Sequence, residues 1–141
     1  MAENRAEFDA RLAALGDLVS RDRVELVARE CLRSIKAVLG KKDAEAFAAL
    51  LPRWLRAEWD GLDPGPPAPG PASLVDTLRE CGKYPYRAAA ERDLTAFFAT
   101  LRESLAEGGA LGIRPLLPEA DRELFDYAAS CAYDASVREF V

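Results

Sequence analysis

A motif that occurs twice constrains the fold of this chain more than any other feature. Residues 50–60 return, sixty-six positions later, as residues 116–126, and both stretches read Leu-Leu-Pro, three variable residues, Arg, two variable residues, a large aromatic residue and Asp. The same offset, continued toward the N-terminus without a gap, pairs apolar positions with apolar positions: Phe8 with Leu74, Leu12 with Leu78, Ile35 with Leu101 and Leu39 with Leu105. We interpret residues 8–60 and 74–126 as an internal duplication.

Each half carries apolar residues at helical spacing. The spacing predicts a helix over about residues 3–15, a long helix over 22–39, a short helix over 44–50 and a further helix that begins at Pro52. The second half repeats this pattern, with its long helix ending near residue 105. No stretch alternates with period two over the length of a strand. The predicted fold class is therefore all-α, a compact helical bundle of two tandem pseudo-symmetric repeats, each of three to four helices.

Glycine and proline residues predict where these helices end. Gly16 and Gly82 follow the first helix of each half, where glycine adopts positive φ without steric cost. The Leu-Pro pairs at residues 51–52 and 117–118 predict sharp corners between two helices, because proline disfavours the α conformation of the preceding residue and suits a first helical turn. In the second half Gly112 and Pro115 weaken the third helix, and the last helix is expected to reach Tyr133.

A proline-rich segment separates the two halves. Five of the nine prolines lie in residues 61–73, and such a segment favours extended conformations, so we expect a surface connector within a single domain that spans residues 1–141. An SH3-type ligand is the alternative, and the absence of a basic residue beside the prolines argues against it.

Composition excludes several classes of function. With 19 basic and 24 acidic residues the net charge is −5, which argues against nucleic acid or an anionic membrane as the main partner. The absence of histidine removes the commonest general base and the usual zinc and haem ligand. Cys31, Cys81 and Cys131 form no Cys-x-x-Cys pair and are interpreted as structural. No metal or cofactor is expected, and without an apolar leader or an apolar span the protein is expected to be cytoplasmic.

The doubled pattern resembles a known bacterial family. Two tandem halves, each with a helix ending in Gly, a long helix and a Leu-Pro corner followed by x3-Arg-x2-aromatic, look like the family catalogued as Domain of Unknown Function 2267. The resemblance covers residues 8–60 and 74–126. It implies a compact helical fold and brings no activity, cofactor or partner. The turn at residues 83–87, the weak third helix of the second half and the extension at 127–141 depart from the family pattern.

The duplication has kept an arginine in both motifs, Arg56 and Arg122. One interpretation makes them a pair of anion-binding groups, since a guanidinium forks onto carboxylate or phosphate. The structural interpretation is that each reaches the free carbonyls at its Leu-Pro corner, or pairs with Asp60 or Asp126 one turn away.

Aromatic residues that differ between the halves are the candidates for partner binding. Trp54 lies off the apolar face of its helix, and an exposed tryptophan favours an interface. A turn with two tyrosines and two cations, Lys83, Tyr84, Tyr86 and Arg87, has the composition of a recognition surface. The alternative for Tyr84 is that it packs under the turn as Leu18 does in the first half.

No catalytic constellation emerges, because the carboxylate pairs lie on solvated helix faces and no nucleophile elbow or glycine-rich phosphate loop is present. The sequence therefore predicts a non-enzymatic protein-interaction or adaptor module. The alternative is a sensor that holds a small apolar or anionic ligand in the seam between the repeats.

Overall fold

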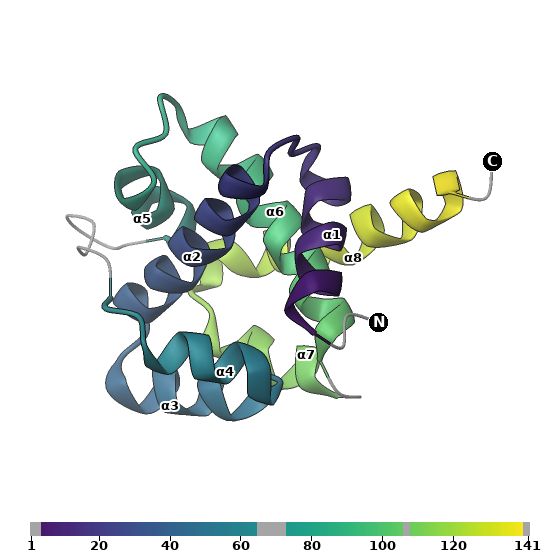
Figure 1. Cartoon of the computed structure of the whole chain (residues 1–141). Coiled ribbons are helices and arrows are strands. Elements are labelled where there is room, and N and C mark those ends of the chain that lie inside the picture. Colours follow the sequence, from purple (N-terminus) through teal and green to yellow (C-terminus); the bar gives the residue numbers. More distant parts are fainter. Residues whose placement is uncertain (1–3, 65–72, 106–107, 140–141) are drawn as a thin grey trace.

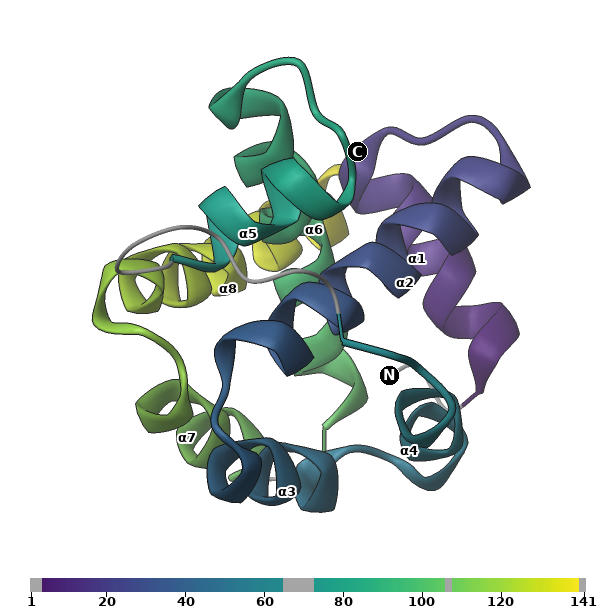
Figure 2. The ribbon, with the colours of Figure 1, turned by 90° about the vertical axis from the view of Figure 1, so that its left-hand side faces the viewer.

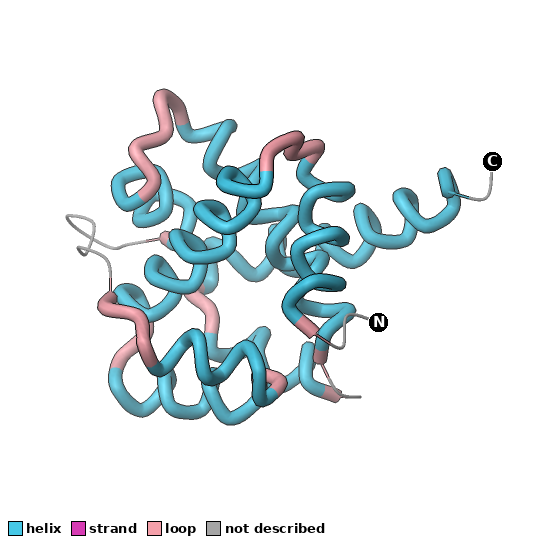
Figure 3. The backbone as a smooth tube through the Cα atoms, viewed as in Figure 1, coloured by secondary structure: helices cyan, strands magenta, loops and turns pink. Residues whose placement is uncertain are grey.

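The computed structural model describes residues 4–64, 73–105 and 108–139, with side chains described up to residue 129. Within these residues the chain forms eight α-helices and one short 3₁₀ helix, and no strand (Figures 1 and 3). The predicted all-α class and compact helical bundle are confirmed. None of the described helices is both long enough and apolar enough to cross a membrane.

Side-chain caps set the start of several helices. Asn4, Ser20 and Ser73 precede α1 (Arg5–Gly16), α2 (Arg21–Val38) and α5 (Leu74–Cys81), and each side-chain oxygen accepts a hydrogen bond from a backbone N–H of the first turn. These bonds satisfy donors that have no partner inside the helix. Polar residues thus fix the beginning of the helices, and their apolar stripes fix the face that is buried.

The two predicted glycine caps are each displaced by one residue. Gly16 is the last residue of α1, and the following Asp17 has the positive φ, 53°. Gly82 is likewise in the right-handed region, and Lys83 has φ of 54°.

Close approach explains both glycines instead of positive φ. A Cβ on Gly16 would lie 3.3 Å from the Cβ of Ala96 on α6, and a Cβ on Gly82 would lie 2.5 Å from the ring of Tyr84. The first glycine therefore allows α1 to approach α6. The second allows Tyr84 to fold back under its turn.

Both Leu-Pro corners form as predicted. In the first half α3 (Lys41–Leu50) ends at Leu51, which is extended with ψ of 146°, and α4 (Arg53–Asp60) follows Pro52. In the second half α7 (Gly109–Ile113) and the 3₁₀ helix η1 (Arg114–Leu116) replace the longer α3, and Leu117 has ψ of 149°. Gly112 and Pro115 account for the shorter helices.

The last helix is longer than predicted. α8 runs over Glu119–Glu139, whereas the sequence pattern placed its end near Tyr133. The printed sequence contains no glycine or proline between these bounds, so no residue breaks the helix. In Figure 1 the C-terminal part of α8 extends away from the body of the molecule.

The long helix α6 (Arg87–Ser104) lies at the centre of the molecule (Figure 2). It packs against α1, α5, α8 and α2, while α2 packs chiefly against α5. The first helix of each half therefore packs on the long helix of the other half. The two long helices, α2 and α6, also touch, but these crossed pairs are more extensive.

The proline-rich connector lies mostly outside the described residues, and the prediction that it is a surface segment stays a prediction there. Lys36 of α2 holds its start beside the end of α4: the Nζ of Lys36 donates to the carbonyl of Leu62 in the connector and to that of Trp59 in α4, at 2.8 Å each. Leu62 also packs against the core. The connector therefore starts from a fixed point.

Because α2 and α6 both contribute to one core, we expect Ile35→Ala and Leu101→Ala each to lower the free energy of unfolding by ~2–5 kcal/mol. Both side chains are fully buried. Urea denaturation followed by circular dichroism measures the change, with the fully exposed Val19→Ala as the control. Two separate transitions in the wild-type protein would contradict a single interlocked core.

Candidate functional site

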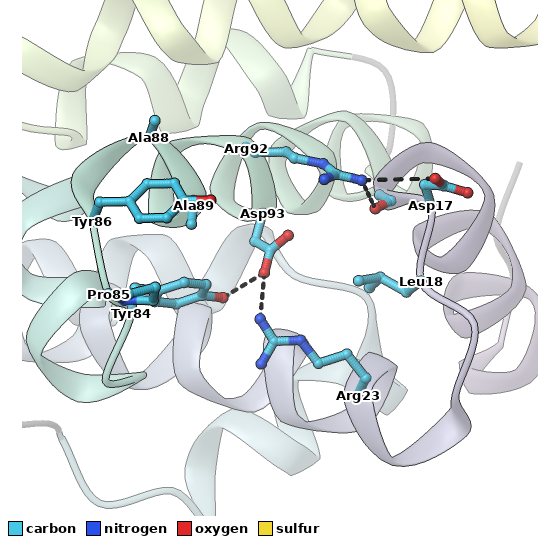
Figure 4. A pocket seen from close by; sticks show the side chains of 11 residues that line it. Asp17, Leu18, Arg23, Tyr84, Pro85, Tyr86, Ala88, Ala89, Arg92 and Asp93 are labelled. Carbon is cyan, nitrogen blue, oxygen red and sulfur yellow. Dashed lines mark hydrogen bonds and ion pairs between the residues drawn. The ribbon is translucent and has the colours of Figure 1, made fainter.

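Two turns from distant parts of the sequence enclose a pocket of about 450 Å³ (Figure 4). One turn joins α1 to α2, and the other joins α5 to α6. The lining side chains come from both turns and from the beginnings of α2 and α6: Asp17, Leu18, Arg23, Tyr84, Pro85, Tyr86, Ala88, Ala89, Arg92 and Asp93.

A buried carboxylate organises the floor of this pocket. Asp93 is 5% exposed, and its Oδ2 accepts hydrogen bonds from the Tyr84 hydroxyl at 2.6 Å and from Nη2 of Arg23 at 2.9 Å. The guanidinium of Arg23 also lies over the Tyr84 ring, 5.3 Å from its centroid. A buried charge requires this degree of pairing, because leaving it without partners costs several kcal/mol of desolvation, on the order of 3–5.

The same environment sets the titration of the groups beneath the pocket. Burial, and then the hydrogen bond to Asp93, raises the pKa of Tyr84 far above its usual value. Burial also raises the pKa of the Cys31 thiol, and the carboxylates of Asp93 and Glu30 act in the same direction. The thiol is thus held in its protonated and unreactive form.

The rim of the pocket carries the exposed side chains. Tyr86 stands just before α6 and is 60% exposed. Across the opening, Nη2 of Arg92 donates to the carbonyl of Gly16 at 3.1 Å and lies 3.9 Å from the carboxylate of Asp17. The Arg92 side chain is nevertheless largely exposed, so it is accessible to a ligand that enters the pocket.

A second pocket of about 430 Å³ adjoins the first. Ala88 and Arg92 line both pockets, and the second is completed by Leu15 of α1 and by Leu124 and Tyr127 of α8. Ala88 has only a methyl group, so little separates the two pockets at that position. We call the two together the α6 groove; it runs over the exposed face of the N-terminal half of α6.

The structure separates the residues of the predicted recognition turn. Tyr84 is buried in the floor of the pocket, so it packs under the turn, as the alternative interpretation predicted. Tyr86 lies on the rim, and the exposed Arg87 forms an ion pair with Asp76. Lys83 is exposed at the positive-φ position and does not line the α6 groove. Only Tyr86 therefore combines exposure with a place in the groove.

Trp54 lies elsewhere, on α4. It is half-buried rather than exposed, because its ring packs edge-on against the fully buried Phe8 with centroids 5.5 Å apart. An exposed tryptophan was the basis for its predicted role in partner binding, and this packing points instead to a contribution to the core.

Arg56 and Arg122, the arginines of the two similar motifs, differ from each other. Arg122 donates from Nε to the carbonyl of Leu117 and from Nη2 to that of Pro115, both at 3.2 Å, as the structural interpretation predicted. Arg56 is exposed, lines a separate pocket with Trp59 and Asp60, and makes no hydrogen bond or ion pair within the described structure. Asp126 pairs with Arg114 and not with Arg122.

Sequence reasoning missed Arg23, Arg92 and Asp93. One signal was present: Asp93 falls on the apolar stripe of α6, between Ala90 and Leu94, where a charged residue requires a buried partner. The partners could not be identified, because Arg23 lies seventy residues away in the sequence.

Among the described residues, no three Cys, Asp or Glu side chains are grouped as metal ligands would be. Searches against known protein families, curated proteins and solved structures find no match to this chain. The resemblance to Domain of Unknown Function 2267 stays a prediction from the motif.

Tyr84→Phe tests the floor of the pocket. The variant removes a hydrogen bond to a buried charge, so we expect it to lower the free energy of unfolding by about 1–2 kcal/mol at neutral pH. The exposed Tyr86→Phe is the control. Because folding raises the pKa of Tyr84 above the unfolded value of about 10, the stability linked to its proton is present below pH ~10 and is lost as the pH rises further. The difference between wild type and Tyr84→Phe should therefore shrink above that pH. A constant difference up to the alkaline unfolding point would contradict this assignment.

The twin arginines form a matched pair for a second test. Arg122→Ala should lower the free energy of unfolding by about 1 kcal/mol, because the carbonyls of Pro115 and Leu117 lose their donor. Arg56→Ala should change it by less than ~0.5 kcal/mol, as for most exposed side chains. Chemical denaturation of the two variants beside wild type measures both values. Equal effects would show that Arg56 also serves its corner.

Proposed function

We propose that this protein is a non-enzymatic interaction module that binds an elongated segment of a partner protein along the α6 groove. The observation that carries the proposal is that two adjoining pockets share Ala88 and Arg92. An exposed tyrosine lies toward either end, Tyr86 in the first pocket and Tyr127, 61% exposed, in the second. A groove formed by two adjoining pockets suits an elongated ligand better than a compact one.

The side chains of the groove have the chemistry of a protein-binding surface. Tyrosine and arginine are enriched among the residues that dominate binding energy, and Tyr86 and Arg92 are both accessible here. The bonds of Asp93 to Tyr84 and Arg23 hold the floor in place before binding. A pre-organised floor supports affinity, because fewer side chains must be ordered when the partner arrives.

An amphipathic helix is the partner element that fits best. The groove offers apolar contact through Leu18 and Pro85 in the first pocket and through Leu15 and Leu124 in the second. Two of its acidic side chains lie beside a base, because Arg23 pairs with Asp93 and Arg92 lies near Asp17, and Glu91 leaves one excess negative charge. A helix that lays an apolar face into a groove, with anchors at i, i+3 or i+4 and i+7, needs such a surface.

A small anionic ligand is the second candidate, in line with a sensor that binds in the seam. The first pocket lies between turns from the two halves and presents Arg23 and Arg92. Its paired carboxylates reduce the attraction for an anion, so the protein partner is the proposal that we develop.

We also propose that residues 8–60 and 74–126 are duplicated repeats and that the chain resembles Domain of Unknown Function 2267. Three observations support the duplication. Asp17 and Lys83, sixty-six positions apart, both have positive φ. Leu51 and Leu117 have nearly the same extended conformation. The crossed packing of α1 on α6 and of α5 on α2 is the arrangement expected for two repeats related by a pseudo-two-fold axis.

Affinity capture from the native host, quantified by mass spectrometry, tests the function. We expect Tyr86→Ala to reduce the recovery of specific partners by roughly tenfold or more, the size of a binding hot spot, without a change in melting temperature. Leu111→Ala is the matched control, because Leu111 is also an exposed large side chain but lies on α7, away from the groove.

A photo-crosslinking residue at Ala88 then locates the partner. Ala88 lines both pockets, and the exposed Ala57 on α4 is the control position. We expect crosslinks to the same partners from position 88 and none from position 57. Recovery that Tyr86→Ala leaves unchanged, or crosslinks that form only from position 57, would contradict the proposal.

A further inference from the structure

A group of cations lines a further pocket, away from the α6 groove. Lys36 near the end of α2, Lys41 at the start of α3 and Arg56 on α4 enclose a volume of about 420 Å³. The other lining residues are Leu39, Ala44, Glu45, Ala48, Trp59 and Asp60. Figures 1 and 2 show α3 and α4 at the end of the molecule opposite the two turns that enclose the first pocket. We call this hollow the Arg56 pocket.

The ammonium group of Lys36 has no carboxylate partner within the described part of the chain. The side chain is half-buried, and its Nζ donates to the carbonyls of Trp59 and Leu62 and lies 5.2 Å from the centroid of the Trp59 ring. An ammonium group has one more N–H donor than these two bonds use. Carbonyl dipoles and a ring face offset only part of the hydration that a half-buried charge loses, so a counter-ion at this position would be stabilising.

Arg56 and Lys41 also keep their donors available. Arg56 is exposed, and its guanidinium is a planar fork of N–H donors that matches the two oxygens of a carboxylate. Asp60 lies one turn further along α4 and does not pair with Arg56 in the structure as described. Glu45 lies one turn from Lys41 on α3 and does not pair with it there either. The pocket thus presents cationic donors that its own acidic side chains leave free.

The other Leu-Pro corner differs in charge and in pairing. There Arg122 donates to the carbonyls of Leu117 and Pro115, and Arg114 pairs with Asp126. The hollow beside these two arginines is lined by two glutamates as well. Of the two corners, only the first therefore presents an arginine that the protein itself does not engage.

The lining of the Arg56 pocket indicates the charge and size of a ligand. Three cations and two acids leave one excess positive charge, which a monoanion neutralises. A phosphate dianion would leave an excess of negative charge beside Glu45 and Asp60. Small-molecule sites usually have volumes of roughly 300–1,000 Å³, so a compact organic acid fits. Its body would meet an apolar wall of Leu39, Ala48 and Trp59, whose ring is backed by Phe47 with centroids 5.0 Å apart.

We propose that the Arg56 pocket binds a small organic acid with a single carboxylate. The carboxylate pairs with the guanidinium of Arg56 and takes the remaining N–H donor of Lys36, and the apolar body of the acid lies against Leu39 and Ala48. Carboxylates are also presented by acidic side chains of proteins, and the experiment below separates that source from a free acid. The inference does not depend on the α6 groove.

Nuclear magnetic resonance of the full chain tests the site through its two tryptophans, because Trp59 lines the pocket and Trp54 does not. We expect benzoate, a flat acid, or hexanoate, a linear one, to shift the indole N–H resonance of Trp59 saturably at constant ionic strength and neutral pH. The resonance of Trp54 should stay in place. Benzamide and hexanamide, which keep the apolar body and lack the charge, are the matched ligand controls. Inorganic phosphate and chloride are the anion controls.

Two arginine variants on α4 locate the binding site. Arg56→Gln should weaken the binding of the acid by roughly tenfold, as expected when one hydrogen-bonded charge contact is lost. Arg53→Gln is the matched control, because Arg53 is exposed on the same helix and does not line the pocket, so this variant should bind like wild type. A melting curve of each variant without ligand shows that both are folded, since neither residue is buried.

Several results would overturn the proposal. They are no saturable shift with either acid, equal binding of an acid and its amide, tighter binding of inorganic phosphate than of both acids, and an Arg56→Gln variant that binds like wild type. A shift that chloride reproduces would show an adventitious ion only. If neither acid binds and Arg56→Gln lowers the recovery of protein partners, the pocket takes an acidic side chain of a partner and not a free acid. The dependence of partner recovery on Tyr86 is measured separately, so the failure of one site leaves the other standing.

Discussion

Edge-on packing between phenylalanines on three helices holds the rest of the molecule in place. Phe97 of α6 meets Phe8 of α1 with ring centroids 6.0 Å apart, and its neighbour Phe98 meets Phe125 of α8 at 5.2 Å. Such geometry adds to the apolar burial of the rings and fixes their mutual angle. The two contacts set the spacing of α1 and α8 along α6, and that spacing leaves the second pocket open between Leu15 and Tyr127.

The other end of the groove depends on electrostatics. Asp93 ties Arg23 at the start of α2 to Tyr84 in the turn before α6. Because the carboxylate is buried, losing either donor would leave a charge with incomplete pairing. The turn is therefore anchored from beneath, which is why Tyr86, two residues after Tyr84, has a fixed place on the rim while its ring stays exposed.

The sequence predicted what depends on local periodicity and failed where distant groups meet. The apolar stripes of α2 and α6 and both Leu-Pro corners follow from neighbouring residues and are confirmed. The positive-φ positions were predicted one residue too early, because the close approach of α6 to Gly16 cannot be recognised from the residues next to that glycine in the sequence. Trp54 was expected on the surface, but its environment is set by Phe8, forty-six residues earlier. The groove could not be predicted from the sequence for the same reason, since α1, α6 and α8 form it together.

Under the proposed duplication, the groove arises from the positions at which the halves diverge. Asp93 corresponds to Val27, which is buried in the core, and Tyr84 corresponds to Leu18. An aspartate at the Val27-like position would be destabilising alone, because a buried carboxylate without donors is costly. It is tolerated because the Tyr84 hydroxyl and Arg23 reach the same oxygen. Asp93, Tyr84 and Arg23 therefore constrain one another. The apolar combination with Val27 and Leu18 is stable, and so is the polar combination with Asp93 and Tyr84, whereas a mixture of the two would leave a buried polar group without a partner. This dependence of the three residues on one another explains why the polar floor, and the groove above it, occur at the Asp93 position and not at the corresponding Val27 position.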